Sequence, residues 1–272
     1  MIHGDFHMHT AFSGDCDSTV ESMIEGAIAK GLDVICITDH NDRDYPFHEE
    51  MKEREFEFDV EKYFRTLRKF QEKYAGKIEI RIGIELGIQP HLGEYYQKLV
   101  ERHPFDFVIG SVHVVNGRDP YYREMFEHQS DTEAYNETFL ATLESLDRVK
   151  NFDVLGHLDY VVRYGKHQGA EYSYEKFAFL IDKILRKVIE AGKGIELNTA
   201  GFKYGLDFPH PHYDVLRRYR ELGGEIITVG ADAHRPEHIA YDFERVGKIL
   251  RDCGFKYYTE FKDRKPIFKQ LP

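Results

Sequence analysis

Short apolar runs alternate with longer amphipathic stretches along the whole chain. The apolar runs are rich in valine, isoleucine and leucine and contain few polar residues, which is typical of parallel strands covered on both faces. This pattern predicts seven strands, at residues 4–9, 33–40, 78–86, 105–113, 152–159, 194–199 and 225–234.

Between these runs, apolar residues recur at the spacing of amphipathic helices. Helices are predicted over residues 18–31, 91–103, 131–149, 174–192, 212–224 and 236–254. The first should begin at Ser18 as its N-cap, because Glu21 follows three positions later. Repeated strand-then-helix units without a Pro/Gly/Ser-rich linker predict a parallel α/β fold in one domain over residues 1–272.

Polar side chains occupy the carboxyl-terminal ends of the predicted strands. They are His7, His9, His40, Glu85, His113, His157, Asn198, Asp232 and His234. In a (β/α) barrel these ends converge on one mouth, whereas in an open sheet they would be spread along a line. A barrel is therefore favoured over a doubly wound sheet.

Three segments fall outside this regular alternation. The connections at residues 41–58 and 115–130 are longer than a barrel needs and emerge at the mouth, so they are candidates for substrate-covering loops. For the charged middle of the first connection, a solvated surface loop is the simpler interpretation. Residues 255–272 resemble a small hairpin.

The polar residues are of the types that bind transition metals. In HMH, the side chains of His7 and His9 point to the same side of a strand, because side chains alternate with a period of two. Asp232 and His234 repeat this spacing, and so do His157 and Asp159. Imidazole and carboxylate without cysteine suit Zn, Mn or Fe.

Each position also has a structural interpretation when taken alone. His7 and His9 could be a hydrogen-bonded core pair, Asp39 and His40 could end a strand in an ordinary turn, and Asp15 could cap a turn. His113 and His157 could each be structural. Glu85 is harder to explain in this way, since an ionised carboxylate between apolar strand residues needs a cation or hydrogen bonds. Because coordinating residues end six of the seven predicted strands, a metal site is the better interpretation of the whole set.

Composition narrows the functional classes. The chain has 37 Lys and Arg against 48 Asp and Glu, a formal net charge of -11, which argues against a nonspecific nucleic-acid surface. Its 3 cysteines show no CxxC spacing, which favours a reducing cytoplasm. No apolar run approaches membrane-spanning length and no secretory leader pattern is present. We expect a soluble cytoplasmic protein without membrane or nucleic-acid partners; its oligomeric state is left open.

The motifs DFHMHTAFSGD, ITDHND, GIELGI, GSVH, GHLD and GADAH resemble, in this order, those of the polymerase and histidinol phosphatase (PHP) family of metal-dependent phosphoesterases. The resemblance extends from residue 2 to about residue 250. The segments KGIELNTAGFKYG and PHPHYDVLRRYRELGGEIITVGADAH are similar to the histidinol-phosphate phosphatase branch.

This resemblance implies a distorted (β/α)7 TIM-like barrel with three divalent metal ions, and its ligands transfer residue by residue. His7, His9, Glu85 and Asp232 would hold the first ion. Glu85 would bridge to the second, which His113 and His157 complete. Asp15, His40 and His234 would hold the third; relatives carry histidine or aspartate at the position of Asp15, so this site could differ in affinity or metal preference.

The implied reaction is hydrolysis of a phosphate monoester, with L-histidinol phosphate as the first candidate. We hypothesise in-line attack by hydroxide held between the ions that share Glu85. Arg163 and Lys203 follow strands at the mouth and are candidate phosphate ligands, although either could be a surface cation. Asp232 or His234 is the candidate proton donor to the leaving alkoxide. Tyr121, Phe202 and the acidic loop after His40 are candidates to contact the rest of the substrate.

Two other functions are compatible with the motifs. A nucleotide-directed phosphoesterase or exonuclease would share the metals, but the acidic charge balance and the lack of an attached polymerase segment count against it. A non-catalytic metal-binding domain would predict broken ligand sets, whereas this set is intact.

Overall fold

Parallel strands form the centre of the molecule. The computed structural model describes residues 1–49 and 56–272, so the middle of the first long connection lies outside the described residues. The strands of the main sheet are β1 (Gly4–Asp5), β2 (Val34–Ile37), β3 (His40–Asn41), β4 (Glu79–Gly87), β5 (Phe107–Ser111), β6 (Val154–Leu155), β7 (Gly194–Asn198) and β8 (Ile227–Gly230). All seven predicted strands are present; β2 and β3 both come from the single run predicted at residues 33–40.

The sheet curves round until its two ends meet. Its order is β1-β2-β4-β5-β6-β7-β8 with β3 beside β4, and every pair is parallel. The segment after β1 returns to the segment of β8, since the Phe6 amide donates to the Val229 carbonyl at 3.0 Å and the His9 amide donates to the Ala233 carbonyl at 2.9 Å. The predicted barrel is confirmed, in a distorted and nearly closed form.

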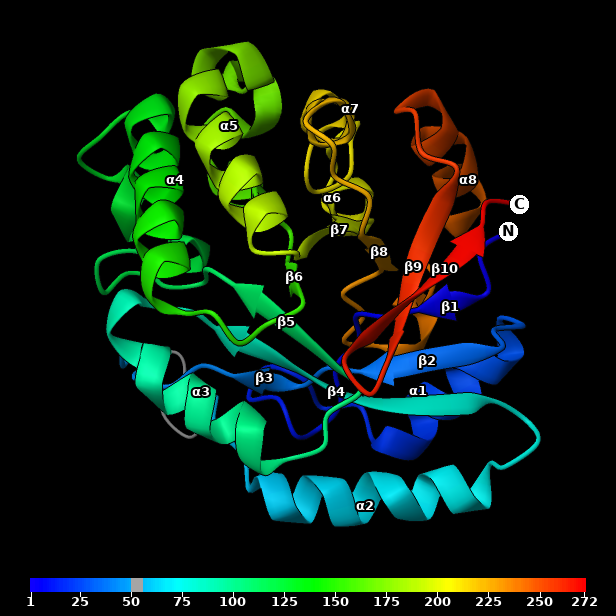
Figure 1. Cartoon of the computed structure of the whole chain (residues 1–272). Helices are drawn as coiled ribbons and strands as arrows, with labels where there is room; N and C mark the ends of the chain where they lie inside the picture. The colour runs from blue at the N-terminus through cyan, green and yellow to red at the C-terminus, as the bar shows by residue number, and fades with distance from the viewer. Residues whose placement is uncertain (50–55) are drawn as a thin grey trace.

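Helices surround the strands (Figure 1). They are α1 (Val20–Ala29), α2 (Val60–Lys73), α3 (Gly93–Arg102), α4 (Asp131–Arg148), α5 (Tyr174–Glu190), α6 (Ala200–Lys203), α7 (Tyr213–Glu221) and α8 (Phe243–Asp252). Neither α2 nor the short α6 was among the predicted helices. Among the described residues, no helix combines the length and apolar character needed to cross a bilayer.

The predicted start of the first helix was wrong by one residue. Thr19 is the N-cap of α1, and its side chain accepts a hydrogen bond from the Ser22 amide at 3.1 Å. The Ser18 hydroxyl instead donates to the carbonyl of His234 at 2.9 Å. Ser18 therefore ties the loop after β1 to the loop after β8, which sequence spacing does not reveal.

The register of the strands places the polar residues at the same height along the barrel axis. His40 pairs with Glu85 between β3 and β4, and Gly87 pairs with Ser111 between β4 and β5. Because all of these strands run in the same direction, their carboxyl ends form one rim. The loops that leave this rim carry most of the candidate ligands.

The other end of the barrel is closed by the carboxyl-terminal hairpin, whose strands are β9 (Tyr257–Lys262) and β10 (Lys265–Gln270). The hairpin crosses in front of the strands in Figure 1. Phe261 stacks on Phe107 with ring centroids 5.0 Å apart. These rings belong to an interior cluster that comprises Phe6, Val34, Cys36, Phe107, Ile109, Val154 and Phe261. The predicted hairpin is confirmed and acts as a plug.

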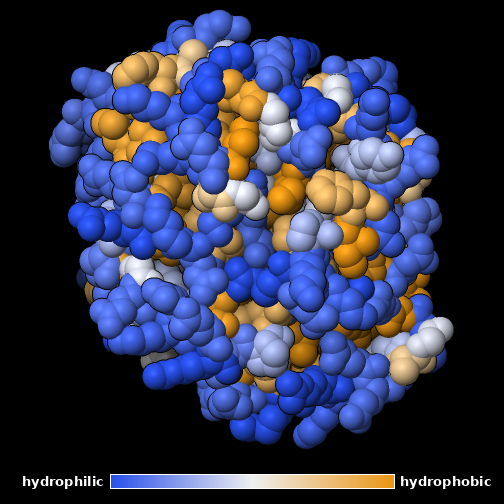
Figure 2. Space-filling model, viewed as in Figure 1, coloured by the Kyte–Doolittle hydropathy of each residue, from blue (hydrophilic) through white to orange (hydrophobic). Residues whose placement is uncertain are grey.

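The outer surface is mixed in character. On the face shown in Figure 2, hydrophilic residues predominate and hydrophobic residues occur in separate groups between them. This agrees with the excess of acidic residues and with a formal net charge of -11.

Candidate metal centre

The predicted ligands meet at the rim of the barrel. They are His7, His9, Asp15, His40, Glu85, His113, His157, Asp232 and His234. Seven of them are buried, whereas the side chains of Asp15 and His234 are 37% and 24% exposed. Imidazoles and carboxylates are thus gathered on the side of the barrel opposite the hairpin.

Glu85 lies at the centre of this group and is fully buried. Its Oε2 lies 3.1 Å from His7 Nε2 and 3.1 Å from His40 Nδ1. Its Oε1 lies 3.0 Å from His157 Nε2 and 3.3 Å from His113 Nε2. The two oxygens of one carboxylate therefore face two different sets of imidazoles, which is the arrangement a bridging ligand needs. Burial alone would raise the pKa of Glu85, but His7, His113 and His40 hold it well below its usual range.

Asp232 approaches the histidines of the HMH motif. Its Oδ1 lies 3.3 Å from His9 Nε2 and 3.8 Å from His7 Nε2. Asp232 has a left-handed backbone with φ of 52°. Such strain in a non-glycine residue is typical of functional positions, where the surroundings fix the side chain.

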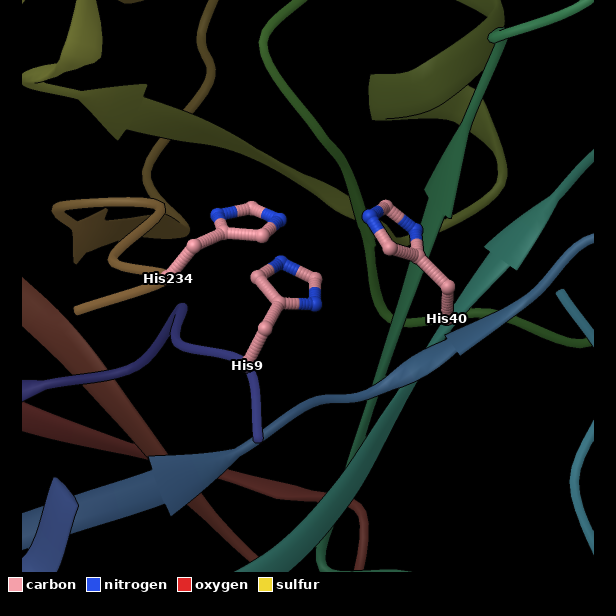
Figure 3. A group of neighbouring side chains, drawn as sticks. All are labelled: His9, His40 and His234. Carbon is pink, nitrogen blue, oxygen red and sulfur yellow. The ribbon is translucent and has the colours of Figure 1, made fainter. Parts of the chain in front are cut away.

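His9, His40 and His234 form a third group, whose rings face one another in Figure 3. The His9 ring stacks on both His40 and His234 with centroid distances of 4.2 Å. Asp15 Oδ2 lies 3.1 Å from His234 Nε2 and 3.7 Å from His40 Nε2. The burial of His9 and the neighbouring His234 and His40 lower the pKa of His9 well below its usual value, so this imidazole is neutral and able to act as a ligand.

Several of these atoms lack hydrogen-bond partners although they are buried. They are Nε2 of His7, His9 and His234, Nδ1 of His40, and Oε2 of Glu85. An unsatisfied buried polar atom costs about 1–3 kcal/mol, so five in one place demand a common explanation. Divalent cations supply it, because each atom presents a lone pair to the same small region. The residues present therefore fit a metal centre, and the grouping His7, His9 and Glu85 and the grouping Glu85, His113 and His157 both have ligand atoms within 4.8 Å of one another.

Two carboxylates orient the ligand histidines from behind. Glu196 accepts from His7 Nδ1 at 2.6 Å and from the His157 amide at 3.0 Å. Asp42 accepts from His113 Nδ1 at 2.7 Å. In both imidazoles the proton is thus fixed on Nδ1, which leaves Nε2 free to bind a metal.

Gly230 makes room for one of these contacts. A Cβ at this position would lie 2.3 Å from the Cβ of His7 and 2.5 Å from Oε1 of Glu196. Only glycine lets β8 approach the imidazole and its carboxylate partner this closely.

Neither Glu196 nor Asp42 was predicted. Glu196 carried a usable signal, because it is a carboxylate inside the apolar strand GIELN, as Glu85 is inside GIELG. Asp42 lies within ITDHND, where nothing in the sequence distinguishes it from a loop residue.

A cavity of about 470 Å³ opens above the ligands. Both predicted phosphate ligands line it. The Nε and Nη1 atoms of Arg163 are buried without partners, whereas its Nη2 donates to the Tyr164 hydroxyl at 2.6 Å. Lys203 Nζ already donates to the carbonyl of Asp232 at 3.0 Å, and burial lowers its pKa. Arg163 therefore has two nitrogen atoms available to bind a ligand, and the Lys203 ammonium also keeps N–H donors beyond its one hydrogen bond.

Aromatic and acidic residues line another part of the cavity. Asp119 accepts hydrogen bonds from the hydroxyls of Tyr45 and Tyr160, and all three residues line the cavity. Tyr121 lines it too and is 59% exposed. Phe202, the other aromatic candidate, instead contacts the Arg245 guanidinium, 4.0 Å from its ring centroid.

Comparisons with known proteins agree with this geometry. The PHP domain model matches residues 5–200. A probable histidinol-phosphatase from Clostridium acetobutylicum is 31% identical over 93% of this chain and 94% of its own length. The histidinol-phosphatase of Lactococcus lactis subsp. lactis is 30% identical over 96% of this chain and 95% of its own length.

A solved structure is also similar. The histidinol phosphate phosphatase from Lactococcus lactis, crystallised with zinc, L-histidinol and phosphate, superposes with a TM-score of 0.87 at 29% identity and covers 97% of this chain and 98% of its own. A putative histidinol phosphatase from Listeria monocytogenes has the same fold, with a TM-score of 0.71 at 20% identity over 89% of this chain and 98% of its own.

Proposed function

Because the chain belongs to the PHP domain family, we propose that it is a metal-dependent phosphatase that hydrolyses L-histidinol phosphate to L-histidinol and phosphate. The reaction is a step of histidine biosynthesis. The observation that carries this proposal is the set of unpartnered ligand atoms around Glu85, at the inner end of a cavity that also holds the unpartnered donors of Arg163.

We assign the ligands to three ions. The first would be held by His7, His9, Glu85 and Asp232, the second by Glu85, His113 and His157, and the third by Asp15, His40 and His234. Because its two oxygens face different sets of imidazoles, Glu85 would be a ligand of both the first and the second ion. Imidazole and carboxylate ligands without thiolate suit Zn, Mn or Fe.

The bound ions would lower the pKa of a coordinated water and offset negative charge on the phosphoryl oxygens. The chain itself binds and orients the ester. Arg163 offers the unpartnered N–H donors of Nε and Nη1 to phosphoryl oxygens, and Lys203 adds a second positive charge. Asp232 and His234 also line the cavity, and we propose one of them as the group that passes a proton to the leaving oxygen.

The alcohol part of the substrate would lie toward the outer cavity. Histidinol carries an ammonium and an imidazole, which need an anionic or aromatic partner. Asp119, held by Tyr45 and Tyr160, offers a buried carboxylate there. We propose that this carboxylate recognises the cationic end of the ester.

The same proposal treats residues 1–272 as one phosphoesterase domain that works in the cytoplasm. The cysteines support this location, because Cys16, Cys36 and Cys253 are free and buried rather than paired.

A steady-state comparison of substrates tests the function. Protein reconstituted separately with Zn²⁺ and Mn²⁺ is assayed for phosphate release from L-histidinol phosphate, mononucleotides and single-stranded DNA. We expect kcat/KM for L-histidinol phosphate to exceed the others by about 100-fold or more, because only this ester has a cationic end for Asp119. Faster turnover of nucleotides or DNA would overturn the substrate, and metal binding without hydrolysis of any ester would overturn the enzyme.

A further inference from the structure

A buried histidine and aspartate form a pair beside the metal centre, outside the assigned ligands. Asp159 and His210 are both fully buried, and the His210 Nδ1 lies 2.7 Å from the Asp159 Oδ1. The other oxygen of Asp159 accepts from the His212 amide at 2.8 Å. Both oxygens of this carboxylate are thus committed to the segment around His210, although the HxD spacing placed Asp159 with the ligand His157.

His210 is also fixed through its backbone. Its amide donates to the Asn198 carbonyl at 2.8 Å, and its carbonyl accepts from the Asn198 amide at 2.7 Å. Asn198 ends β7, and its side chain donates to Glu196 at 3.1 Å and accepts from the Ala200 amide at 2.9 Å. The segment of residues 199–212 therefore leaves β7 and returns to it, with Asp159 holding the point of return.

The two segments that meet at this pair carry Arg163 and Lys203, two of the cations that line the cavity. Asp159 directly precedes a 3₁₀ turn, Tyr160–Tyr164, which contains Arg163. The segment of residues 199–212 contains α6, which ends at Lys203. The segments touch again farther out, because the Arg163 guanidinium carbon lies 4.2 Å from the ring centroid of Tyr204.

We propose that Asp159 and His210 are positioning residues, whose hydrogen bond holds these two segments together and so places Arg163 and Lys203 at the phosphate end of the cavity. This inference rests on the proposed function, since it assumes that both cations bind a phosphoryl group. Neither residue is among those that line the cavity, so we assign neither a contact with the substrate.

The chemistry of the pair suits this role. Burial lowers the pKa of His210, so the imidazole is neutral and keeps its proton on Nδ1 facing the carboxylate. A hydrogen bond from a neutral donor to a buried carboxylate is stronger than one between neutral groups. Without the hydrogen bond from His210, one oxygen of Asp159 would have no donor, and the segment that carries Lys203 would no longer be held in place.

Variants at His210 test the proposal best, because Asp159 lies only two residues from the ligand His157. His210→Leu removes the donor, whereas His210→Asn keeps an N–H near the position of Nδ1. In protein loaded with Zn²⁺, we measure KM and kcat for L-histidinol phosphate, Ki for inorganic phosphate, and metal per chain. For His210→Leu we expect KM and Ki to rise by about tenfold or more with unchanged metal content. His210→Asn should stay within about threefold of the parent.

Asp182→Asn is the matched control. Asp182 accepts from Arg218 at 2.7 Å and from Tyr174 at 2.8 Å on the outer helices, away from the cavity. Its loss should leave KM and Ki unchanged. If His210→Leu also leaves Ki unchanged, or if it lowers the metal content instead, the positioning role is wrong.

A combined variant separates positioning from general destabilisation. With Arg163→Met and Lys203→Met already present, His210→Leu should raise Ki by no more than about twofold further, because both groups that the pair positions are gone. Fully additive effects would overturn the proposal. If His210→Leu does not fold, Asp159→Asn replaces it with the same readouts. If the parent protein fails to hydrolyse L-histidinol phosphate, the proposed function falls, while the affinity for inorganic phosphate still tests the pair.

Discussion

At the scale of single residues, Glu85 is the position on which the metal centre depends most. Its two oxygens face two sets of imidazoles at 3.0–3.3 Å, and it is fully buried. Removing it deprives two of the proposed ions of a shared ligand and leaves several imidazoles facing one another.

Replacing Glu85 with alanine should therefore abolish most of the activity. We expect kcat/KM to fall by at least about 100-fold and the metal content to fall by about one ion per chain or more. Phosphate release and elemental analysis of the purified variant measure both. Glu79→Ala, at the exposed start of the same strand, is the control and should change neither. A loss below about tenfold in Glu85→Ala would contradict the bridging role.

Lys193 gives a pH-dependent prediction at a site remote from the metals. Its ammonium lies 4.5 Å from the ring centroid of Phe152, and burial lowers its pKa from 10.5 to about 8. Below about pH 8 the lysine is charged in both folded and unfolded chains, so the cost of burying the charge is fully present. Between about pH 8 and 10.5 the folded chain is neutral there while the unfolded chain is still charged, so the cost disappears as pH rises.

The parent protein should therefore gain stability relative to Lys193→Met as the pH rises through this window. Because the side chain is partly exposed, we expect a change of about 1–2 kcal/mol in the difference between their free energies of unfolding. Urea unfolding of both proteins at pH 7.5, 9 and 10.5 measures it. A constant or falling difference would mean that this ammonium is not desolvated.

The residue scale is also where the sequence was most informative. Polar residues at strand ends, with HMH and ADAH at period two, predicted that these side chains would gather at one rim of the barrel, whereas Asp15 entered the predicted set only through the family resemblance. Glu196 was missed although it carried the same signal as Glu85. The pairing of Asp159 with His210, 51 residues apart, could not be predicted, because it depends on how one loop folds back on a strand.

At the scale of elements, the carboxyl-terminal hairpin has a larger role than its sequence indicated. The sequence of residues 255–272 predicted a small hairpin, but it does not indicate which surface of the barrel that hairpin covers. In the structure β9 inserts Phe261 into the interior cluster, whereas the Phe268 side chain on β10 remains largely outside, at 46% exposed for the residue.

Phe261→Ala should destabilise the protein strongly. The ring is 3% exposed and stacks on Phe107, so its loss leaves a cavity in the barrel interior and should cost about 3–5 kcal/mol. Phe268→Ala is the control and should cost less than about 1 kcal/mol. Chemical unfolding monitored by circular dichroism compares them, and equal small effects would mean that the hairpin does not act as a plug.

At the scale of the whole molecule, the predicted metal centre connects strands from all round the barrel. The predicted ligands come from β4 and from segments around β1, β3, β5, β6 and β8, and several of their ligand atoms have no hydrogen-bond partner. The strand order could be predicted from the alternation of elements, since parallel strands with intervening helices leave few topologies. The shortness of β1 and β6 could not be predicted in this way, because the barrel is distorted where the predicted ligands gather.

Metal removal should accordingly lower the thermal stability. A ligand present at 100 to 1,000 times its Kd contributes about 3–4 kcal/mol, which in a chain of this size corresponds to a fall in Tm of about 5–15 °C after chelation. Differential scanning calorimetry before and after treatment with a chelator measures the shift, and added Zn²⁺ should restore it. In Glu85→Ala the same treatment should produce a smaller fall. A Tm unchanged by chelation would argue against structural coupling of the ions to the barrel.

The hairpin plug has a consequence for the timing of the reaction. With Phe261 and its neighbours filling the barrel below Glu85, both products must leave by the mouth through which the ester entered. In the proposed binding mode phosphate would form beside the predicted metal ligands, behind the alcohol, which would lie near the exposed Tyr121. The alcohol should therefore depart first and phosphate last. Product-inhibition kinetics would then show phosphate competing with the ester and histidinol acting as a mixed inhibitor. This order of release would follow from the closure of the opposite end of the barrel by the hairpin.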